Sequence, residues 1–188
     1  MLRVLVVDNY DSFTGMLVDA LRVGGAEVAV RRNDESGAED VSAYHGVLVS
    51  PGPGTPARAG VTPAVVARSA QTRTPLLGVC LGHQAIGEHW GARLTRWAPV
   101  HGKPVAIRHT GTGLYAGLPS PAAMTCYNSL GIEDVPAPLL VTATDEAGRV
   151  MGLRHAELPI EGVQFHPESV ASRGGARLIR NWLASLET

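Results

Sequence analysis

Short apolar runs set the strongest limit on how this chain folds. The first run, Leu2 to Val7, is rich in valine and has Arg3 near its start as its one polar residue, and runs without a polar residue lie at Gly46 to Val49 and Pro75 to Val79. A strand with one face in water alternates apolar and polar residues along its length, whereas these runs show no such alternation. They therefore predict strands that are buried on both faces, as in a parallel sheet covered by helices on each side.

Segments with helical spacing separate these runs. They predict helices between Phe13 and Leu21, from Thr62 to about Gln71, from Gly82 to Trp90 and around Ile179 to Leu186. Gly24-Gly25 predicts the end of the first helix, and Thr62-Pro63 predicts a start, with Thr as the cap and Pro in the first turn. A further strand is predicted around Val28 and Val30. This alternation predicts an α/β fold with a doubly wound, mostly parallel sheet and helices on both faces.

The pattern changes after Gly91. Short strand-like pieces follow at Leu94–Trp97, Pro104–His109, Leu139–Thr144 and Val150–Arg154, separated by Gly, Pro and Asp. We interpret them as a small antiparallel appendage to the parallel sheet. An apolar strand is then predicted at Gly162–His166, and no repeat or linker divides the chain. We expect one domain over residues 1–188.

Composition excludes several classes of protein. Of the 188 residues, 45% are hydrophobic and 18% are charged, which suits one buried core and argues against disorder. The net charge of −1 argues against a basic nucleic-acid binder and against a polybasic membrane surface. No apolar run reaches the roughly 20 residues of a membrane helix, and Asp8 ends the first run too early for a signal peptide. The two cysteines, without a CxxC pair, predict a reduced cytoplasmic protein.

The sequence Gly78-Val79-Cys80-Leu81-Gly82 lies between a predicted strand and a predicted helix. This is the pattern of a nucleophile elbow, with Cys in place of Ser, whose tight turn requires small residues on both sides. The N-terminus of the following helix favours the reactive thiolate, and the amide of Leu81 is placed to bind an oxyanion. The alternative is a buried structural cysteine, but the paired glycines favour a nucleophile.

A cysteine nucleophile requires a base, and His166 is the best candidate among seven histidines. It ends a predicted strand, at the edge where open α/β sheets place their sites. Glu168 lies two residues further on, on the same face of an extended chain, where its carboxylate orients the imidazole. Without Cys80, a His–Glu pair that merely caps a strand end is an equally good interpretation. His83 follows Cys80 too closely on the predicted helix and is expected to point away from the sulfur.

The segment Ser50-Pro51-Gly52-Pro53-Gly54-Thr55-Pro56 also follows a predicted strand. Glycine allows a ligand to approach the backbone closely, and proline stiffens the loop. The amide of Gly52 is a candidate second oxyanion donor. The segment lacks the GxxxxGK[ST] pattern of a phosphate-binding loop. Considered alone, a Pro/Gly run of this kind is better interpreted as an ordinary turn.

Together these segments resemble class I (triad) glutamine amidotransferases, and within them the small subunits of anthranilate synthase and aminodeoxychorismate synthase. The matching stretches are Val7 to Thr14 (VDNYDSFT), Ser50 to Gly54, Leu77 to Gln84 (LGVCLGHQ), His101-Gly102-Lys103 and Glu161 to Ser169 (EGVQFHPES). They span nearly the whole chain in the family's order. The resemblance implies a flavodoxin-like α/β fold.

The resemblance also implies residue roles. Cys80 forms a γ-glutamyl thioester with L-glutamine, His166 transfers protons, Glu168 holds His166, and the amides of Gly52 and Leu81 stabilise the oxyanion. The implied glutamine contacts are Gly52, Pro53, Gly54, Leu81, Gln84, Ser129 and Leu130. The half-reaction implies no metal and no organic cofactor in this chain. Ammonia passes to a separate chorismate-using synthase subunit, which binds Mg²⁺.

Two departures from the family pattern leave alternatives open. Asn128 stands where the family usually has His, and Gly15-Met16 stands where it has an aromatic residue and Asn. They are either neutral or adapted to a specialised partner. Besides an active glutaminase subunit, the sequence allows a regulatory binding subunit with little turnover or a free-standing γ-glutamyl cysteine hydrolase. The DNYDSFT start argues against the free hydrolase.

Overall fold

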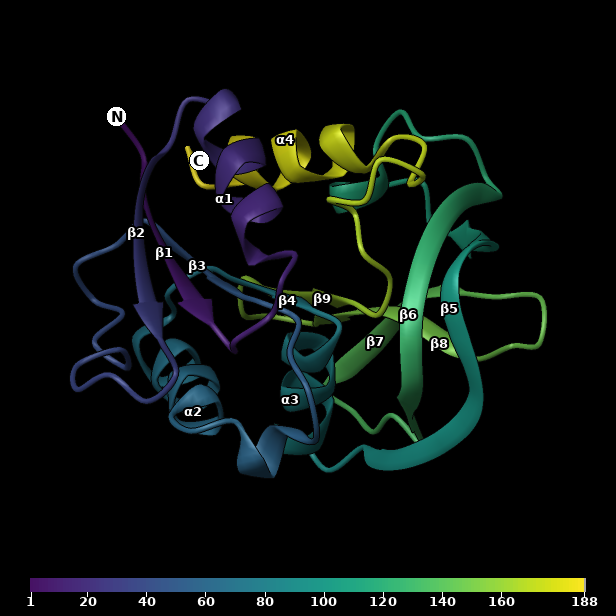
Figure 1. The fold of residues 1–188 in the computed structure, drawn as a ribbon, viewed down its shortest axis with the longest axis horizontal. Coiled ribbons are helices and arrows are strands. Elements are labelled where there is room, and N and C mark those ends of the chain that lie inside the picture. Colours follow the sequence, from purple (N-terminus) through teal and green to yellow (C-terminus); the bar gives the residue numbers. More distant parts are fainter. Residues whose placement is uncertain (188) are drawn as a thin grey trace.

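The computed structural model describes residues 1–187, which form one nine-stranded sheet in the order β2-β1-β3-β4-β9-β8-β7-β5-β6 (Figure 1). The first five strands of this order run parallel, and the remaining strands are antiparallel to their neighbours. The strands are β1 (Arg3–Asp8), β2 (Glu27–Arg32), β3 (Gly46–Val49), β4 (Leu76–Val79), β5 (Arg93–His109), β6 (Ala122–Glu133), β7 (Leu139–Thr144), β8 (Val150–His155) and β9 (Ile160–Val163). The mostly parallel sheet with an antiparallel extension confirms the predicted fold class.

Helices cover both faces of the parallel strands. Figure 1 shows α1 (Thr14–Val23) and α4 (Gly175–Ser185) on one side, with α2 (Thr62–Thr72) and α3 (Leu81–His89) on the other. Short 3₁₀ turns lie at η1 (Pro56–Arg58) and η2 (Gly113–Tyr115). None of the helices within residues 1–187 is both long and apolar enough to cross a membrane.

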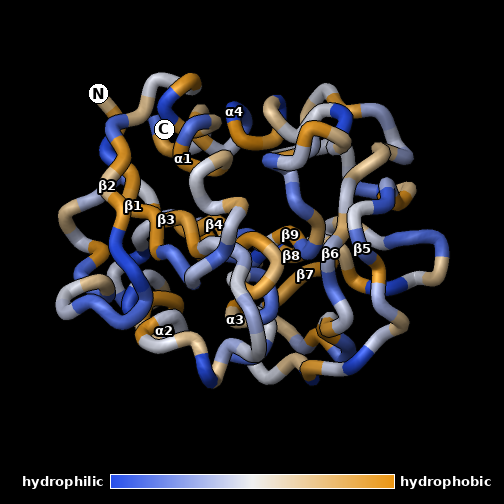
Figure 2. Tube along the Cα trace, viewed as in Figure 1, coloured by the Kyte–Doolittle hydropathy of each residue, from blue (hydrophilic) through white to orange (hydrophobic). Residues whose placement is uncertain are grey.

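The continuous apolar runs form two cores, one on each face of the sheet. In β1, Val4 and Val6 pack with α1 and α4, while Leu5 and Val7 pack with α2 and α3. Figure 2 shows the resulting apolar colour along β1, β3 and β4 and polar colour in the surrounding loops. Successive side chains of a strand point to opposite faces, so a strand that lies between two helical layers has to be apolar at every position.

The antiparallel part differs from the prediction in extent. β5 is one strand from Arg93 to His109 rather than two pieces, and β6 was not predicted. The two strands pair along most of their length, with register shifts between Arg96 and Val100 and between His101 and Lys103. The pairing provides hydrogen-bond partners for the backbone of both strands. It joins residues that are distant in the sequence, so the local pattern of polar and apolar residues does not predict it. The last two residues of β5 join this hairpin to β7.

Two predicted element ends were wrong. Thr62 is the first residue of α2, not its cap, because its hydroxyl donates a hydrogen bond to Asn9 Oδ1 (2.6 Å) instead of capping the helix. β9 ends at Val163, so His166 lies beyond the strand. The backbone amide of His166 donates to the carbonyl of Thr125 in β6 (2.8 Å), an isolated bridge that places the histidine at the junction of the sheet with the β5–β6 hairpin.

Candidate active site

Cys80 occupies a sharp turn between β4 and α3. Its backbone has φ 53° and ψ −101°, a conformation that is strained for a residue with a side chain. A Cβ atom on Gly78 would lie 2.5 Å from the backbone of Gly82, and one on Gly82 would lie 2.5 Å from the carbonyl oxygen of Val49. Both positions therefore require glycine. The geometry is that of the predicted nucleophile elbow. It places Cys80, which is 7% exposed, at the carboxyl edge of the sheet, where the residue lines a cavity.

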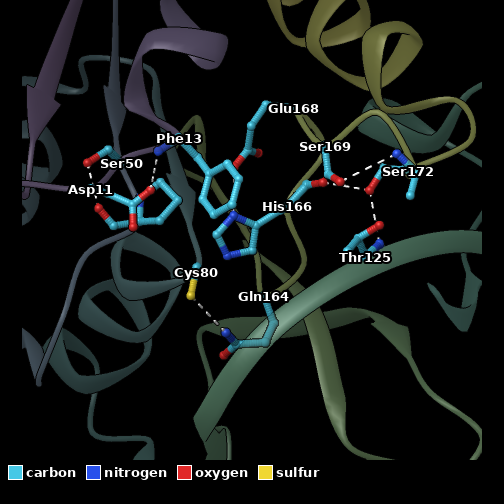
Figure 3. A network of polar contacts seen from close by, with 12 residues as sticks. Asp11, Phe13, Ser50, Cys80, Thr125, Gln164, His166, Glu168, Ser169 and Ser172 are labelled. Atoms are coloured by element: carbon cyan, nitrogen blue, oxygen red, sulfur yellow. Dashed lines mark hydrogen bonds and ion pairs between the residues drawn. The ribbon is translucent and has the colours of Figure 1, made fainter. Parts of the chain in front are cut away.

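His166 and Glu168 form a buried pair beside Cys80. His166 Nδ1 lies 2.6 Å from Glu168 Oε1, and the side chains are 2% and 0% exposed. Because a carboxylate accepts hydrogen bonds, Nδ1 is the donor. The other ring nitrogen, Nε2, is buried and has no hydrogen-bond partner within residues 1–187. In Figure 3 this edge of the ring faces Cys80, so the structure brings the three predicted catalytic residues together.

The environment of His166 favours its charged form. Burial alone lowers the pKa of the imidazole, but interactions with the Cys80 sulfur and with the Glu168 carboxylate outweigh burial and raise the pKa to about 10. At neutral pH the ring is therefore an imidazolium that faces the sulfur. Such a pair is the arrangement in which a cysteine is a nucleophile and its histidine partner is ready to donate a proton.

Further contacts hold His166 in place, and the sequence did not reveal them. The rings of Phe13 and Tyr127 meet the imidazole edge-on, with centroids at 5.5 Å and 5.1 Å. Ser172 donates to the carbonyl of His166 (2.6 Å) and accepts from the amide of Thr125 (2.9 Å), as Figure 3 shows. Phe13 and Tyr127 lie 153 and 39 positions from His166 in the printed sequence, and no local pattern connects such distant residues.

Asn9 holds the loop that carries Gly52. Its side-chain amide donates to the carbonyl of Ser50 (2.9 Å), and its Oδ1 accepts from Asn33 Nδ2 (2.9 Å) and from the Thr62 hydroxyl. A Cβ atom on Gly52 would lie 2.5 Å from Cβ of Asn9, so this position also requires glycine. Within the described residues, the amides of Gly52 and Leu81 donate no hydrogen bond to the protein. Their role as oxyanion donors stays a prediction, with which this lack of a protein acceptor is compatible.

A cavity of about 160 Å³ opens beside the sulfur. Six of its lining residues are predicted glutamine contacts, and the full lining is Gly52, Pro53, Gly54, Cys80, Gln84, Tyr127, Asn128, Ser129 and Leu130. Leu81 does not line the cavity, and its predicted contribution is its backbone amide. Tyr127 was not predicted to line the cavity. A small cavity with several polar groups and one reactive sulfur suits a small polar substrate.

Polar side chains connect the cavity wall to the nucleophile. Gln84 Nε2 lies 3.0 Å from the carbonyl of Leu130 and 3.1 Å from Gln164 Oε1, and Gln164 Nε2 lies 3.5 Å from Cys80 Sγ. Asn128 Nδ2 donates to the same carbonyl of Leu130 (2.9 Å). Asn128 is thus part of the cavity wall, whereas Gly15 and the partly exposed Met16 lie on α1.

Two other titratable residues, His83 and Cys126, are buried outside the cavity. His83 is fully buried on α3 against Gly162, and burial lowers its pKa to about 3, so the ring is neutral. Cys126 is fully buried on β6, and burial raises the pKa of its thiol to about 12. Neither residue lines the cavity beside Cys80. This agrees with the expectation that His83 is not the base.

The fold and the site define a cysteine-dependent α/β enzyme with a Cys–His–Glu arrangement. The family model for class-I glutamine amidotransferases matches residues 5–186, and the chain belongs to this family. It is 50% identical to anthranilate synthase component 2 of Mycobacterium tuberculosis over 190 residues, covering 97% of this chain and 82% of that protein. It is 46% identical to aminodeoxychorismate synthase component 2 of Klebsiella aerogenes, covering 96% and 98%.

Among solved structures, the fold is similar to a glutamine amidotransferase from Thermotoga maritima. The TM-score is 0.82 at 17% identity, and the match covers 98% of this chain and 97% of that chain. At this identity the likeness concerns the fold alone. It shows that a glutamine amidotransferase of known structure has this arrangement of sheet and helices.

Proposed function

We propose that this chain is the glutamine-hydrolysing subunit of a chorismate-using synthase, acting on L-glutamine through a thioester at Cys80. The observation that carries the proposal is the charged His166–Glu168 pair that faces an elbow cysteine next to a small cavity. The relatives named component 2 of anthranilate synthase and of aminodeoxychorismate synthase supply the biochemical setting.

In the acylation step, the Cys80 thiolate attacks the side-chain carbonyl carbon of glutamine and forms a C–S bond. The carbonyl oxygen becomes an oxyanion, which the amides of Gly52 and Leu81 bind. The oxyanion then reforms the carbonyl, the C–N bond breaks, and His166 gives its proton to the nitrogen that leaves as ammonia. Glu168 keeps Nδ1 protonated, so that Nε2 is the atom that transfers the proton.

In the deacylation step, neutral His166 accepts a proton from a water molecule through Nε2. The resulting hydroxide attacks the thioester carbon, the C–S bond breaks, and the sulfur leaves as a thiolate. Glutamate is released and the charged His166–Cys80 pair is restored. The proposal uses no metal or organic cofactor in this chain, and assigns Mg²⁺ to the synthase subunit. We place the complex in the cytoplasm, with ammonia passing between its subunits.

Substitution of Cys80 tests the proposal. Cys80→Ser is expected to abolish synthesis from glutamine in the complex, while synthesis from added ammonium salts continues, because the synthase needs only ammonia. Cys126→Ala is the matched control, since Cys126 is the other free cysteine and lies outside the cavity. Normal glutamate release by Cys80→Ser, measured with and without the synthase, would contradict the proposal.

The same assay separates the remaining alternatives. An active subunit is a weak glutaminase alone and is stimulated by its synthase. A regulatory subunit stays inactive in the complex, and a free-standing hydrolase is fully active without any partner. The product formed from chorismate, glutamine and Mg²⁺ then identifies the synthase as an anthranilate enzyme, an aminodeoxychorismate enzyme or a relative from secondary metabolism that makes another aminated product.

A further inference from the structure

Gln164 contacts the reacting sulfur but has no part in the mechanism above. It follows β9 and precedes Phe165, and its side chain is fully buried. Its Nε2 lies 3.5 Å from Cys80 Sγ, and its Oε1 lies 3.1 Å from Gln84 Nε2. Figure 3 shows the amide reaching towards the sulfur on the side away from Glu168.

A chain of hydrogen bonds that starts at a backbone carbonyl determines which end of the Gln164 amide faces Cys80. The carbonyl of Leu130 can only accept a hydrogen bond, so the atom of Gln84 that faces it at 3.0 Å is the NH₂ group. The same NH₂ group faces Gln164 and can only donate, so the facing atom of Gln164 is its oxygen. The NH₂ group of Gln164 is therefore left to face Cys80. Neutral amides do not titrate, so this direction persists at every working pH.

We propose that Gln164 is a catalytic residue that donates an N–H hydrogen bond to the Cys80 sulfur and favours the thiolate. The proposal rests on the proposed role of Cys80 as the nucleophile. A hydrogen bond to an ionised acceptor is roughly twice as strong as one to a neutral acceptor, so the donor selectively stabilises the charged sulfur. The sulfur loses this charge when the C–S bond forms and regains it when water breaks that bond.

Gln164 complements the charged groups around the sulfur. His166 faces the sulfur from the segment after β9, is paired with Glu168, and is positively charged. On β6, burial raises the pKa of Cys126 to about 12, and on α3, burial lowers the pKa of His83 to about 3, so both are neutral. Tyr127 lines the cavity from β6. Gln164 is a neutral donor, so it can keep its hydrogen bond to the Cys80 sulfur even when His166 has given up its proton.

The test is the rate at which iodoacetamide alkylates Cys80, followed by mass spectrometry of the Cys80 peptide across a range of pH. Gln164→Met keeps the length of the side chain but removes the donor. We expect the pH of half-maximal alkylation rate to rise by about one unit, the shift that loss of a hydrogen bond to a charged group produces. Gln164→Glu keeps an acceptor for Gln84 and is expected to shift the profile in the same direction.

Gln71→Met, which removes an exposed amide on α2, is the matched control and is expected to leave the profile unchanged. A residue that only fills space would not move the profile, so superimposable profiles for wild type and Gln164→Met would overturn the inference. If Gln164→Met does not fold, Gln164→Leu, which also lacks the donor and carries no charge, decides by the same criterion. If wild type itself fails to hydrolyse glutamine, the proposed function fails instead, which is a separate outcome.

Discussion

At the scale of single residues, partners with fixed hydrogen-bonding roles orient the polar groups around Cys80. The Glu168 carboxylate can only accept, which makes Nδ1 of His166 a donor and leaves Nε2 for proton transfer. The Leu130 carbonyl likewise directs the amides of Gln84 and Asn128. The site is thus organised before a substrate arrives, and preorganised polar groups are what stabilise a developing charge.

Glu168→Gln is expected to change how stability depends on pH. Folded His166 keeps its proton up to a pKa of about 10, whereas unfolded histidine loses it near 6.5. Between these values the folded state binds more protons than the unfolded state, so the free energy of unfolding falls as pH rises. The contribution of the charged ring is complete below pH 6.5 and is lost at about pH 10.

A neutral Gln attracts the imidazolium less than a carboxylate does. In Glu168→Gln the free energy of unfolding therefore falls less with rising pH, and its fall ends at lower pH. The difference between the two proteins is expected to be about 1 kcal/mol or more at pH 6.5 and to shrink towards pH 10. Urea unfolding at the two pH values measures it. Parallel pH curves for wild type and Glu168→Gln would remove Glu168 from the charge balance of the site.

Asn128→His is expected to leave glutamine hydrolysis within about tenfold of wild type, because one hydrogen bond contributes on the order of 1 kcal/mol. Asn128 Nδ2 donates to the Leu130 carbonyl, while its Oδ1 is buried without a partner in residues 1–187. A ring N–H can replace the donor. Titration of the synthase against both proteins, with glutamate release as readout, measures the effect. Restoration of turnover in an otherwise inactive chain would instead favour the regulatory subunit.

At the scale of elements, side-chain hydrogen bonds join three chain segments next to the loop that carries Gly52. Asn9 follows β1, Asn33 follows β2 and Thr62 starts α2, and all three meet at the side chain of Asn9. Through Ser50 this junction holds the loop after β3. The amide of Gly52 is therefore positioned by the ends of several elements rather than by its own loop alone.

Asn9→Asp is expected to lower kcat for glutamine hydrolysis by about tenfold or more, because a displaced oxyanion donor stabilises the transition state less. The substitution keeps the acceptor for Asn33 and Thr62 but replaces the donor to Ser50 with a second acceptor. Asn181→Asp is the matched control: it breaks amide bonds to Leu114 and Ala116, far along the chain from the loop, and should cost stability without lowering kcat. Equal kcat values for Asn9→Asp and wild type would exclude this positioning role.

At the scale of the whole molecule, some exposed apolar side chains belong to segments that are close in sequence to residues around His166. Tyr10, in the loop between β1 and α1, is 52% exposed, and Met16, in the first turn of α1, is 36% exposed. Phe13, which lies between them in the sequence, packs on the imidazole. Val170, four residues after His166, is 94% exposed. In the proposed complex these residues are candidates for the contact with the synthase, since aromatic residues and methionine are enriched in interfaces.

Met16→Lys is expected to weaken stimulation by the synthase about tenfold or more, since it places a charge in a desolvated contact. Stability should change little, as is usual for surface substitutions. Val23→Lys, at the other end of the same helix, is the matched control because Val23 is 87% exposed. Titration of the synthase with glutamate release as readout compares them. Equal effects of the two substitutions would place the contact elsewhere.

Much of the parallel half was predictable because its signals are local. The apolar runs of β1, β3 and β4 predict strands covered on both faces, and the glycines around Cys80 predict a tight elbow. The antiparallel half was less predictable. β6 has no clear alternation, and its pairing with β5 across a long loop decides that it is a strand.

The resemblance to the family implied most of the cavity wall. By itself, the sequence predicted the class of fold, the elbow cysteine and the histidine–glutamate pair. These depend on short patterns, in which neighbouring residues constrain one another through the backbone. Other contacts became visible only in the folded structure. Phe13 and Tyr127 pack on the imidazole, Asn9 holds the loop that carries Gly52, and Gln164 faces the sulfur. Such contacts join residues far apart in the chain, and their distances exist only once the sheet has brought the strand ends together.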